Sequence, residues 1–280
     1  MPDADAGPLA LLVLPPIGWI AAAIWGALWG SFFNVCIHRV GLYESVVRPR
    51  SRCPSCGRPI AALENIPIVS WLVLRGRCRG CRAPISIRYP LVELLSLAVA
   101  LAVYWRFVDD GVGEPIARLG RFFVYFAFAG TLIVLSGIDF DHQLSPDRIT
   151  YPAIPIAFAC ALVLRDVPPR DLAIGAVAGY ALVAATAELS YRLLGREGMG
   201  YGDAKLLALV GALLGWRAVV LTFFGAPFFG LLIVPAVHVI KRRKVLGVAI
   251  PYGPFLAAAA FAYLLFGDRI LQAFAFSAPS

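Results

Sequence analysis

The chain has 280 residues, of which 60% are hydrophobic and 15% are charged, and its net charge is +8. Soluble domains carry about 25% charged residues, and a mean hydropathy of +0.78 is too apolar for a water-exposed surface. These values exclude a disordered chain, a disulfide scaffold and a soluble globular domain, and they argue against a nucleic-acid partner. The sequence predicts an all-α polytopic membrane protein.

Apolar runs long enough to cross a bilayer recur along the chain. A transmembrane helix needs about 20 apolar residues. The first run is interpreted as a retained span because the chain opens without a basic segment and no small-residue cleavage site follows. The sixth run, only 11 residues long, is interpreted as a half-span or as the visible part of a helix that begins earlier. About eight spans are predicted, at 9–37, 89–107, 121–138, 149–165, 171–194, 206–216, 218–240 and 248–266.

Basic residues predict which loops face the cytoplasm. Residues 38–88 carry ten Arg and two acids, and residues 241–244 read Lys-Arg-Arg-Lys, so both segments are expected on the cytoplasmic side. The acidic loop 108–118 suits the opposite side. Alternation from these anchors places 139–148 and 195–205 in the cytoplasm and both termini outside.

The polar segment after the first span divides the chain into three predicted parts. Residues 1–37 form the first span, residues 38–88 form a cytoplasmic domain, and residues 89–280 form a transmembrane core. The middle part is too small to bury a large hydrophobic core, so a structural metal is expected to stabilise it.

Four of the six cysteines form two CxxC pairs in this cytoplasmic domain. Two such pairs present four thiolates to one tetrahedral ion, and four thiolates leave no open coordination position. A single structural Zn²⁺ per chain is therefore predicted, in a small zinc-ribbon-like insertion. The predicted ligands are Cys53, Cys56, Cys78 and Cys81. Cys36 and Cys160 lie in apolar spans and are expected to be small buried hydrophobic residues.

Two acids lie where predicted spans reach the cytoplasmic face. Asp139 follows the apolar run LIVLSGI, and Asp203 follows Gly198-Met199-Gly200-Tyr201-Gly202. Acids at such positions are candidates for function. Two carboxylates within a few Å share one proton, so one acts as a general base and the other as an acid. The glycines before Asp203 are expected to let an extended substrate backbone approach and to permit unusual dihedral angles.

Other acids compete for the same role. A lone Asp beyond an apolar run is often a helix cap or a solvated loop residue. Asp147 follows Pro146 and precedes a span, so it fits a helix N-cap, whereas Asp141 is expected to be exposed in the loop. Glu188, inside the fifth span, is interpreted as an interior polar contact without a catalytic role.

Several segments, in this order, resemble the type IV prepilin peptidases, which are membrane aspartic proteases of the GxGD type. Ser145 departs from the pattern, since an apolar residue is common there. The matching segments are GSFFNVCIHRV (30–40), RCPSCGRPI (52–60), ENIPIVSWLVLRGRCRGCRAPISIRYPLVELL (64–95), IDFDHQLSPD (138–147), GMGYGDAKL (198–206) and IPYGPFLA (250–257).

The resemblance implies a set of site residues. The two family aspartates fall on Asp139 and Asp203, and Gly200, Gly202 and Lys205 fall beside the second as active-site support. The family's zinc cysteines fall on the four cysteines named above. The cysteine loop resembles that of the bifunctional form, which also methylates the new N-terminus with S-adenosylmethionine.

The resemblance also implies a substrate and a location. Family members cleave prepilins and type II secretion pseudopilins after a Gly at the cytoplasmic face of the bacterial inner membrane. A peptidase without methyltransferase activity and a small proton- or cation-coupled transporter stay open as alternatives. No glycine-rich nucleotide fingerprint is present, and the cofactor contacts and the oligomeric state are left unassigned. The polar residues Asn65 and Glu93 are best explained by loop hydrogen bonds.

Overall fold

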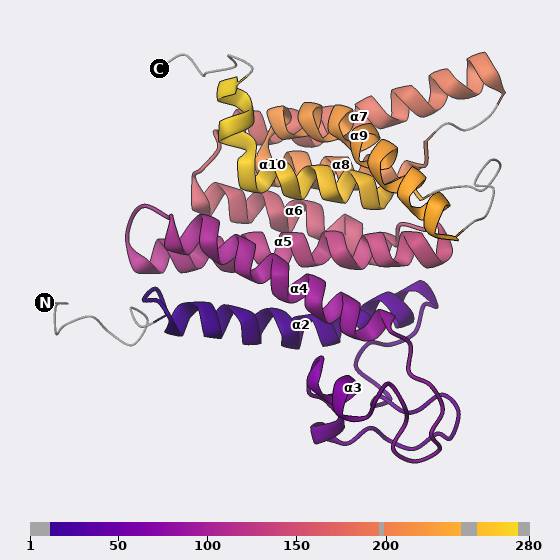
Figure 1. Cartoon of the computed structure of the whole chain (residues 1–280). Helices are drawn as coiled ribbons and strands as arrows, with labels where there is room; N and C mark the ends of the chain where they lie inside the picture. Colours follow the sequence, from indigo (N-terminus) through magenta and orange to yellow (C-terminus); the bar gives the residue numbers. More distant parts are fainter. Residues whose placement is uncertain (1–11, 196–198, 242–250, 274–280) are drawn as a thin grey trace, which may run out of the picture. The chain divides into compact units, whose positions relative to one another are not determined.

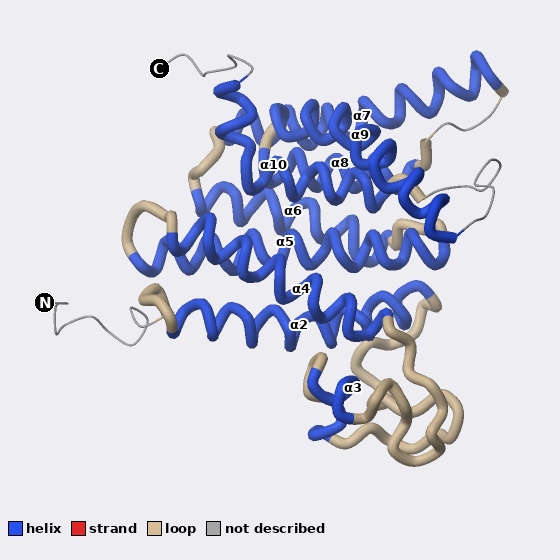
Figure 2. Tube along the Cα trace, in the orientation of Figure 1, coloured by secondary structure: helices blue, strands red, loops and turns tan. Residues whose placement is uncertain are grey.

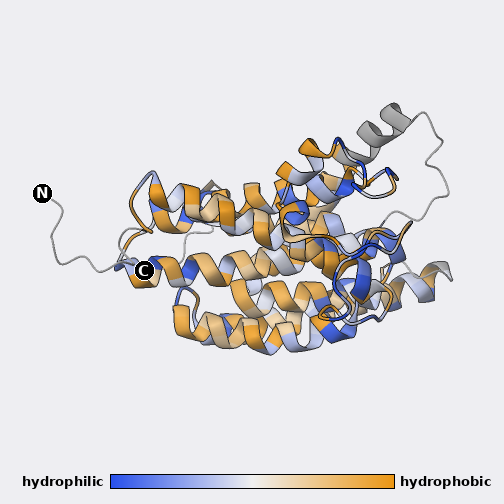
Figure 3. Ribbon diagram, turned by 90° about the horizontal axis from the view of Figure 1, so that it is seen from below, coloured by the Kyte–Doolittle hydropathy of each residue, from blue (hydrophilic) through white to orange (hydrophobic). Residues whose placement is uncertain are grey.

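The computed structural model describes residues 12–195, 199–241 and 251–273, and the chain divides into two compact units, residues 1–134 and 135–280. Over the described residues, secondary structure consists of helices without any strand (Figure 2). Hydrophobic residues run along the lengths of the helices in both units (Figure 3). The predicted all-α membrane fold is thus confirmed for the described part of the chain.

In the first unit, helices α2 and α4 pack against each other (Figure 1). Its elements are α2 (Ile17–Gly41), η1 (Ala62–Asn65), α3 (Val69–Val73), α4 (Arg88–Tyr104), the π-helical η2 (Trp105–Asp109) and the first part of α5 (Pro115–His142). The buried face of α2 has a small residue at every fourth position, namely Gly18, Ala22, Gly26 and Gly30. A Cβ atom at Gly30 would lie only 2.7 Å from Glu93 Cα, so this stripe lets the backbones approach closely.

The segment between α2 and α4, residues 42–87, is mostly loop. We call it the cysteine island. It contains η1, α3 and two isolated antiparallel β-bridges, Arg52 to Pro59 and Arg77 to Pro84. Each bridge closes one of the two CxxC turns, so both cysteine pairs lie in similar local structures.

The second unit is arranged around helix α8. Its elements are α6 (Asp147–Leu164), α7 (Pro169–Leu194), α8 (Tyr201–Leu214), α9 (Trp216–Lys241) and α10 (Gly253–Ala273), together with the end of α5. Helix α8 contacts α6, α7, α9 and α10 (Figure 1). Ten of its 14 residues are buried, which explains why the predicted sixth span was apolar on every side.

Glycines determine how closely α7 approaches α8. Gly175 and Gly179 lie four residues apart on α7. A Cβ at Gly179 would lie 2.5 Å from Leu207 O, and one at Gly175 would lie 2.6 Å from Gly215 C. Helices in membranes associate through such small-residue contacts because lipid provides no hydrophobic driving force between them.

All eight predicted spans coincide with helices over the residues that the structure describes, and six of these helices qualify there as complete spans. Helices α2, α4 with η2, α5, α6, α7 and α10 are long and apolar enough to cross a bilayer. Helix α8 is too short, and it begins at Tyr201, before the apolar run, as one of the two interpretations expected. Helix α9 runs from Trp216 to Lys241, and its fully described part, residues 216–232, is an apolar helix shorter than a complete span. The predicted start of the first span at residue 9 and the basic residues 242–244 lie outside the described residues.

Candidate active site and metal centre

Asp139 lies in the last turn of α5. The helix extends to His142, one turn beyond the predicted span. It ends because Gln143 adopts a φ of 52°, and Gln143 N donates to Asp139 O at 2.8 Å. The Asp139 side chain is half-buried. The apolar helix therefore holds this carboxylate at its end rather than in a free loop.

Asp203 lies in the first turn of α8. Gly200 is the N-cap residue, with extended backbone angles of −81° and 148°. Asp203 N donates to Gly200 O at 3.0 Å, which begins the helix. Carboxylates are favourable in a first turn because the unpaired N–H groups there carry partial positive charge. The same short turn thus positions the acid and starts the central helix.

Asp139 and Asp203 line one pocket of about 280 Å³ within the second unit. The two carboxyl groups are close enough to interact electrostatically. The structure therefore brings together the two acids that sequence analysis singled out. The lining residues are Leu135, Asp139, Gln143, Leu144, Ser145, Gly200, Tyr201, Gly202, Asp203, Leu206 and Gly253.

Gly253, the first residue of α10, lies in the segment IPYGPFLA that resembles the family, but no role was predicted for it. Its backbone N–H donates to Asp139 Oδ2 at 3.1 Å, across a sequence separation of 114 residues. A Cβ at this position would lie 2.7 Å from the same oxygen. The glycine therefore provides both a hydrogen-bond donor and the space for the carboxylate. The Gly-Pro pair at 253–254 lies five residues inside the predicted last span, and it was the available sequence signal for a helix start there.

The glycines before Asp203 act differently from the expectation. Neither Gly200 nor Gly202 has a positive φ, so these two glycines do not use the unusual dihedral angles that the sequence permits, while Gly198 lies outside the described residues. A Cβ at Gly202 would lie 2.6 Å from Ser145 Cβ, whereas one at Gly200 would meet nothing closer than 3.9 Å. Gly202 is therefore required by packing, and the small Ser145 side chain fills that contact. Only Gly200 leaves open space beside the pocket.

Lys205 connects the start of α8 to the start of α6. Its ammonium group pairs with the Asp147 carboxylate and lies 4.9 Å from the centre of the Tyr151 ring. The expectation that Asp147 caps α6 is wrong, because Pro146 is the N-cap residue and no side chain caps the helix. In a Pro-Asp pair before a span, the Asp can be either the N-cap residue or the first helical residue. Here Asp147 is the first residue of α6, and its carboxylate pairs with Lys205.

Two other acids lie outside the pocket. Asp141 is exposed as expected, but it belongs to the last turn of α5 rather than to the loop. Glu188 is not an interior contact, because it is half-exposed and binds Arg192 Nε at 2.6 Å, one helical turn away. An i,i+4 ion pair on a helix surface explains this acid.

The four cysteines of the island form one cluster. Their Sγ atoms all lie within 4.8 Å of one another, and Cys53 Sγ lies 3.8 Å from Cys81 Sγ. A tetrahedral Zn²⁺ with bonds of about 2.3 Å separates its sulfur ligands by roughly 3.8 Å. All four are free thiols. The donor set and its spacing therefore fit a tetrahedral metal ion.

The two cysteine turns have matching hydrogen bonds. Cys53 N donates to Arg58 O at 2.9 Å, and Cys78 N donates to Ala83 O at 2.8 Å. The residue after each pair has a left-handed φ, 69° at Gly57 and 62° at Arg82. Backbone hydrogen bonds from Cys56 and Ser55 lower the pKa of the Cys53 thiol to about 6. The first turn thus directs backbone N–H groups toward the Cys53 sulfur, which favours its thiolate.

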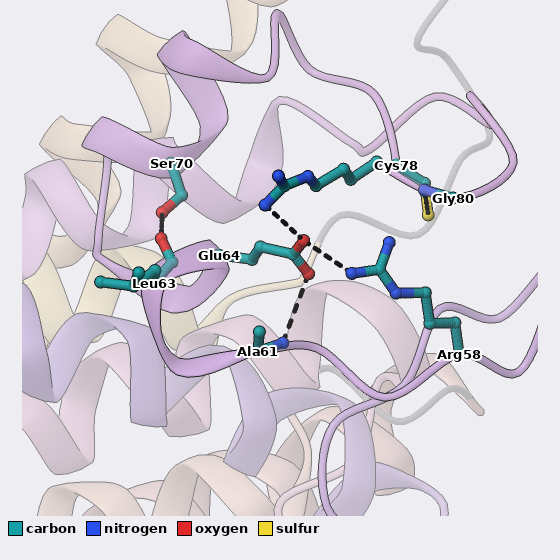
Figure 4. A network of polar contacts seen from close by, with 8 residues as sticks. Arg58, Ala61, Leu63, Glu64, Ser70, Cys78 and Gly80 are labelled. Atoms are coloured by element: carbon teal, nitrogen blue, oxygen red, sulfur yellow. Dashed lines mark hydrogen bonds and ion pairs between the residues drawn. The ribbon is translucent and has the colours of Figure 1, made fainter.

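Glu64 connects η1 to both cysteine turns (Figure 4). Its carboxylate binds Arg58 at 2.9 Å and Arg79 at 3.5 Å, and it accepts the Ala61 N–H at 3.3 Å. The Ala61 hydrogen bond, followed by the charge of Arg58, lowers the pKa of Glu64 below its usual value. One acid thus holds the cysteine cluster against the short helical part of the island.

Glu93 is buried in the second turn of α4, and its carboxylate accepts the Ile68 N–H at 2.6 Å. The expected loop hydrogen bond is confirmed for Glu93, while Asn65 is exposed in η1. Cys36 and Cys160 are only partly buried. Full burial, which was expected for both thiols, is therefore not found within the described residues.

Comparisons with known proteins agree with this arrangement. Residues 24–107 match the family model for the Bacterial Peptidase A24 N-terminal domain, and residues 126–235 match that for the Type IV leader peptidase family. No solved structure matches the chain significantly.

Curated relatives cover nearly the whole chain. A prepilin leader peptidase/N-methyltransferase of Aeromonas hydrophila is 39% identical over 92% of this chain and 94% of its own length. Those of Dichelobacter nodosus and Burkholderia pseudomallei (strain 1026b) are 35% and 36% identical, over 95% and 94% of this chain and 97% and 91% of their own. At this identity and coverage, the chain belongs to the prepilin leader peptidase/N-methyltransferase family.

Proposed function

We propose that this chain is a membrane aspartic endopeptidase that removes the leader from prepilins and N-methylates the new N-terminus. The single observation that carries the peptidase half is the common pocket of Asp139 and Asp203. Two acids on separate helices that interact in one half-buried site are suited to share a proton. The family names of the curated relatives support both activities.

The hydrogen bond from Gly253 to Asp139 supports one division of roles between the two acids in the proposed reaction. Asp139 accepts the Gly253 N–H, and a hydrogen bond to a carboxylate favours its ionised form. Asp139 then acts as the general base that removes a proton from water. Asp203 is the protonated partner and donates its proton to the scissile carbonyl oxygen. Collapse of the tetrahedral intermediate breaks the C–N bond, and the leaving amine takes the proton held by Asp139. One hydroxyl of the intermediate returns its proton to Asp203 as the new carboxyl group forms, which restores both acids to their starting states.

The pocket suits a substrate with little side chain at the scissile bond. Ser145 and Gly202 are packed closely in its wall, and Gly200 leaves room for a backbone beside Asp203. We propose that the substrates are prepilins and type II secretion pseudopilins, cut after a Gly that precedes their hydrophobic helix. Lys205 supports the site because its pair with Asp147 joins the first turns of α8 and α6.

We propose that the cysteine cluster holds one structural Zn²⁺ per chain. Four thiolates complete a tetrahedral shell and leave no position for substrate or water. The residues that would bind it are Cys53, Cys56, Cys78 and Cys81. The island buries little apolar surface, so its folding free energy is expected to come largely from the metal.

The methyl-transfer half is assigned to no residue. S-adenosylmethionine, when bound, supplies a methyl group that the new terminal amine accepts with loss of a proton. Glu93 is engaged with Ile68 N–H, so its burial is explained without a cofactor. A peptidase without methyl transfer is the second candidate, because the cysteine island also fits a purely structural role.

The proposed location is the bacterial inner membrane, with the pocket and the cysteine island on the cytoplasmic side. Ten Arg residues in 38–88 support this orientation, because cytoplasmic loops are enriched in Lys and Arg. Asp139 and Asp203 both lie at helix ends, as cleavage at a membrane surface requires. A transporter is disfavoured because acids at such ends do not form a binding site at the bilayer midplane.

The test is incubation of the purified full chain with a prepilin in detergent. We expect cleavage after the Gly, read by mass spectrometry of the new N-terminus, and a loss of about 10³-fold or more in rate for Asp139→Asn or Asp203→Asn. Asp141→Asn is the matched control, since Asp141 is exposed one half-turn away, and it should cleave normally. Full activity in both pocket variants would reject the proposed pair. Methyl label transferred from S-adenosylmethionine separates the bifunctional enzyme from a peptidase alone.

A further inference from the structure

Five of the exposed apolar side chains of the cysteine island are grouped in one stretch of its sequence. They lie in and between η1 and α3. Leu63 is 80% exposed and Val73 is 74% exposed. On α3, Val69, Leu72 and Val73 have the i, i+3, i+4 spacing of a single helix face. The full set is Leu63, Ile66, Val69, Leu72 and Val73.

Hydrogen bonds hold one face of α3 against the rest of the cysteine island. The orientation of α3, and therefore the exposure of its opposite, apolar face, is fixed by these contacts. Ser70 is buried, and its Oγ donates to Leu63 O at 2.9 Å (Figure 4). Trp71 Nε1 donates to Ile85 O at 3.1 Å. These contacts hold one side of α3 against the island and leave the apolar side uncovered by residues of the described first unit.

The contact with Glu93 shows where α3 lies along the axis of helix α4. This residue is five positions after Arg88, the start of α4, which corresponds to about 7.5 Å along a helix axis. Its carboxylate binds the N–H of Ile68, the N-cap residue of α3. The start of α3 is therefore level with the second turn of a membrane span rather than beyond its end.

The part of α4 at this level also exposes apolar side chains. Leu91 and Leu94 are 55% and 46% exposed on either side of Glu93 in sequence. Arg75 and Arg77 follow α3 directly, and both are exposed. Apolar residues with adjacent basic residues are the pattern of an interfacial element that binds anionic lipid.

We propose that η1 and α3 form a membrane-surface anchor, in which the five apolar side chains enter the bilayer interface and the neighbouring Arg side chains bind anionic headgroups. The cysteine island is then a domain lying partly in the membrane surface rather than one suspended in the cytoplasm. This inference does not depend on the peptidase assignment, because it uses only contacts of the first unit.

The test places a photoreactive residue on the anchor of the full chain. The variant Leu72→benzoylphenylalanine is reconstituted in nanodiscs of phosphatidylcholine, with or without phosphatidylglycerol, and irradiated. Ser55→benzoylphenylalanine is the matched control, since Ser55 is exposed in the first cysteine turn. Retained metal, at one equivalent per chain, shows that the island is folded. If the Leu72 variant loses metal, Val73 is used instead.

We expect phospholipid adducts, read by mass spectrometry, several-fold more abundant from position 72 than from position 55. Their yield should rise with phosphatidylglycerol. Adducts confined to residues 135–280 or to an added prepilin would overturn the proposal, because the apolar face would then bind protein. Equal lipid yields from both positions would also overturn it, and equal yields with and without phosphatidylglycerol would contradict the role of the Arg residues.

Discussion

The cysteine island and helix α8 are opposite solutions to the problem of holding functional side chains in place. In the described island, residues 42–87, only Cys53, Ser70 and Gly76 are buried. In α8, by contrast, ten of 14 residues are buried. The island depends on cysteines and on hydrogen bonds to Glu64 and Glu93, whereas α8 depends on helix packing. The two regions should therefore respond to different perturbations.

Removing one thiol gives the largest expected effect. Cys53→Ser should release the metal and unfold the island, because structural Zn²⁺ sites contribute about 10–16 kcal/mol of apparent binding free energy. The membrane helices should stay inserted, since their packing does not involve the cysteines. Metal content per chain and protease sensitivity within 42–87 measure the two parts.

If the cysteine island and the membrane helices are stabilised independently, loss of the metal should unfold the island alone. Cys36→Ser is the matched control, because Cys36 lies on α2 outside the cluster, and it should keep its metal. Wild-type protein with far less than one Zn²⁺ per chain would contradict the metal assignment. Loss of all helical signal in the Cys53 variant would contradict the independence of the two regions.

Removing the hydrogen bond from Gly253 tests the other region. Gly253→Ala and Gly253→Pro both add a Cβ 2.7 Å from Asp139 Oδ2, which the flexible end of that side chain can avoid. Only the Pro variant also removes the N–H. Pro is tolerated at the first position of a helix, and Gly253 is the first residue of α10.

The Pro variant should therefore cleave prepilin about 10²-fold more slowly than the Ala variant, as for other removed donors at active sites. The loss should appear in kcat with KM little changed, because the hydrogen bond acts on Asp139 rather than on the substrate. Metal content should not change in either variant. Equal rates for the two variants would show that only the space at Gly253 matters.

The site residues differ in how far the sequence predicts their contacts. Loop charges and alternation of spans predict only that Asp139 and Asp203 lie on the same membrane face, and their pairing was implied by the family resemblance. The bond from Gly253 to Asp139 joins residues 114 positions apart, and no periodic pattern encodes a single backbone donor. The CxxC spacing predicts the cysteine cluster because the ligands are local to two short turns.

Other features of the fold cannot be predicted from sequence patterns. An apolar run of 11 residues does not show where its helix begins, and α8 begins at Tyr201 because Gly200 adopts an extended cap conformation. The pairing of Asp147 with Lys205 is equally hidden, since it depends on how α6 and α8 pack. Residues whose role depends on packing between distant helices could not be assigned from one sequence.

Adding a methyl group between α7 and α8 should have a moderate effect on stability. A Cβ in Gly179→Ala would lie 2.5 Å from Leu207 O, a backbone atom that cannot turn away. Overpacking of this kind costs about 1–3 kcal/mol. Gly120→Ala on α5 is the matched control because nothing lies within 4 Å of its Cβ, and it should be neutral or slightly stabilising. Thermal unfolding in detergent compares them, and equal midpoints would contradict the close α7–α8 contact.

The smallest effect concerns the two cysteine turns themselves. Gly57 and Arg82 occupy matching left-handed positions, with φ of 69° and 62°. A residue with a Cβ costs about 1 kcal/mol or more in this conformation, whereas glycine adopts it freely. Arg82→Gly should therefore strengthen metal retention by up to roughly fivefold against a competing chelator, less the gain in unfolded-state entropy from the added glycine. Gly57→Ala should weaken retention by a similar factor. Because the two turns have the same hydrogen bonds, opposite signs are required, and a loss of metal in both variants would show that the Arg82 side chain, rather than its backbone angle, stabilises the second turn.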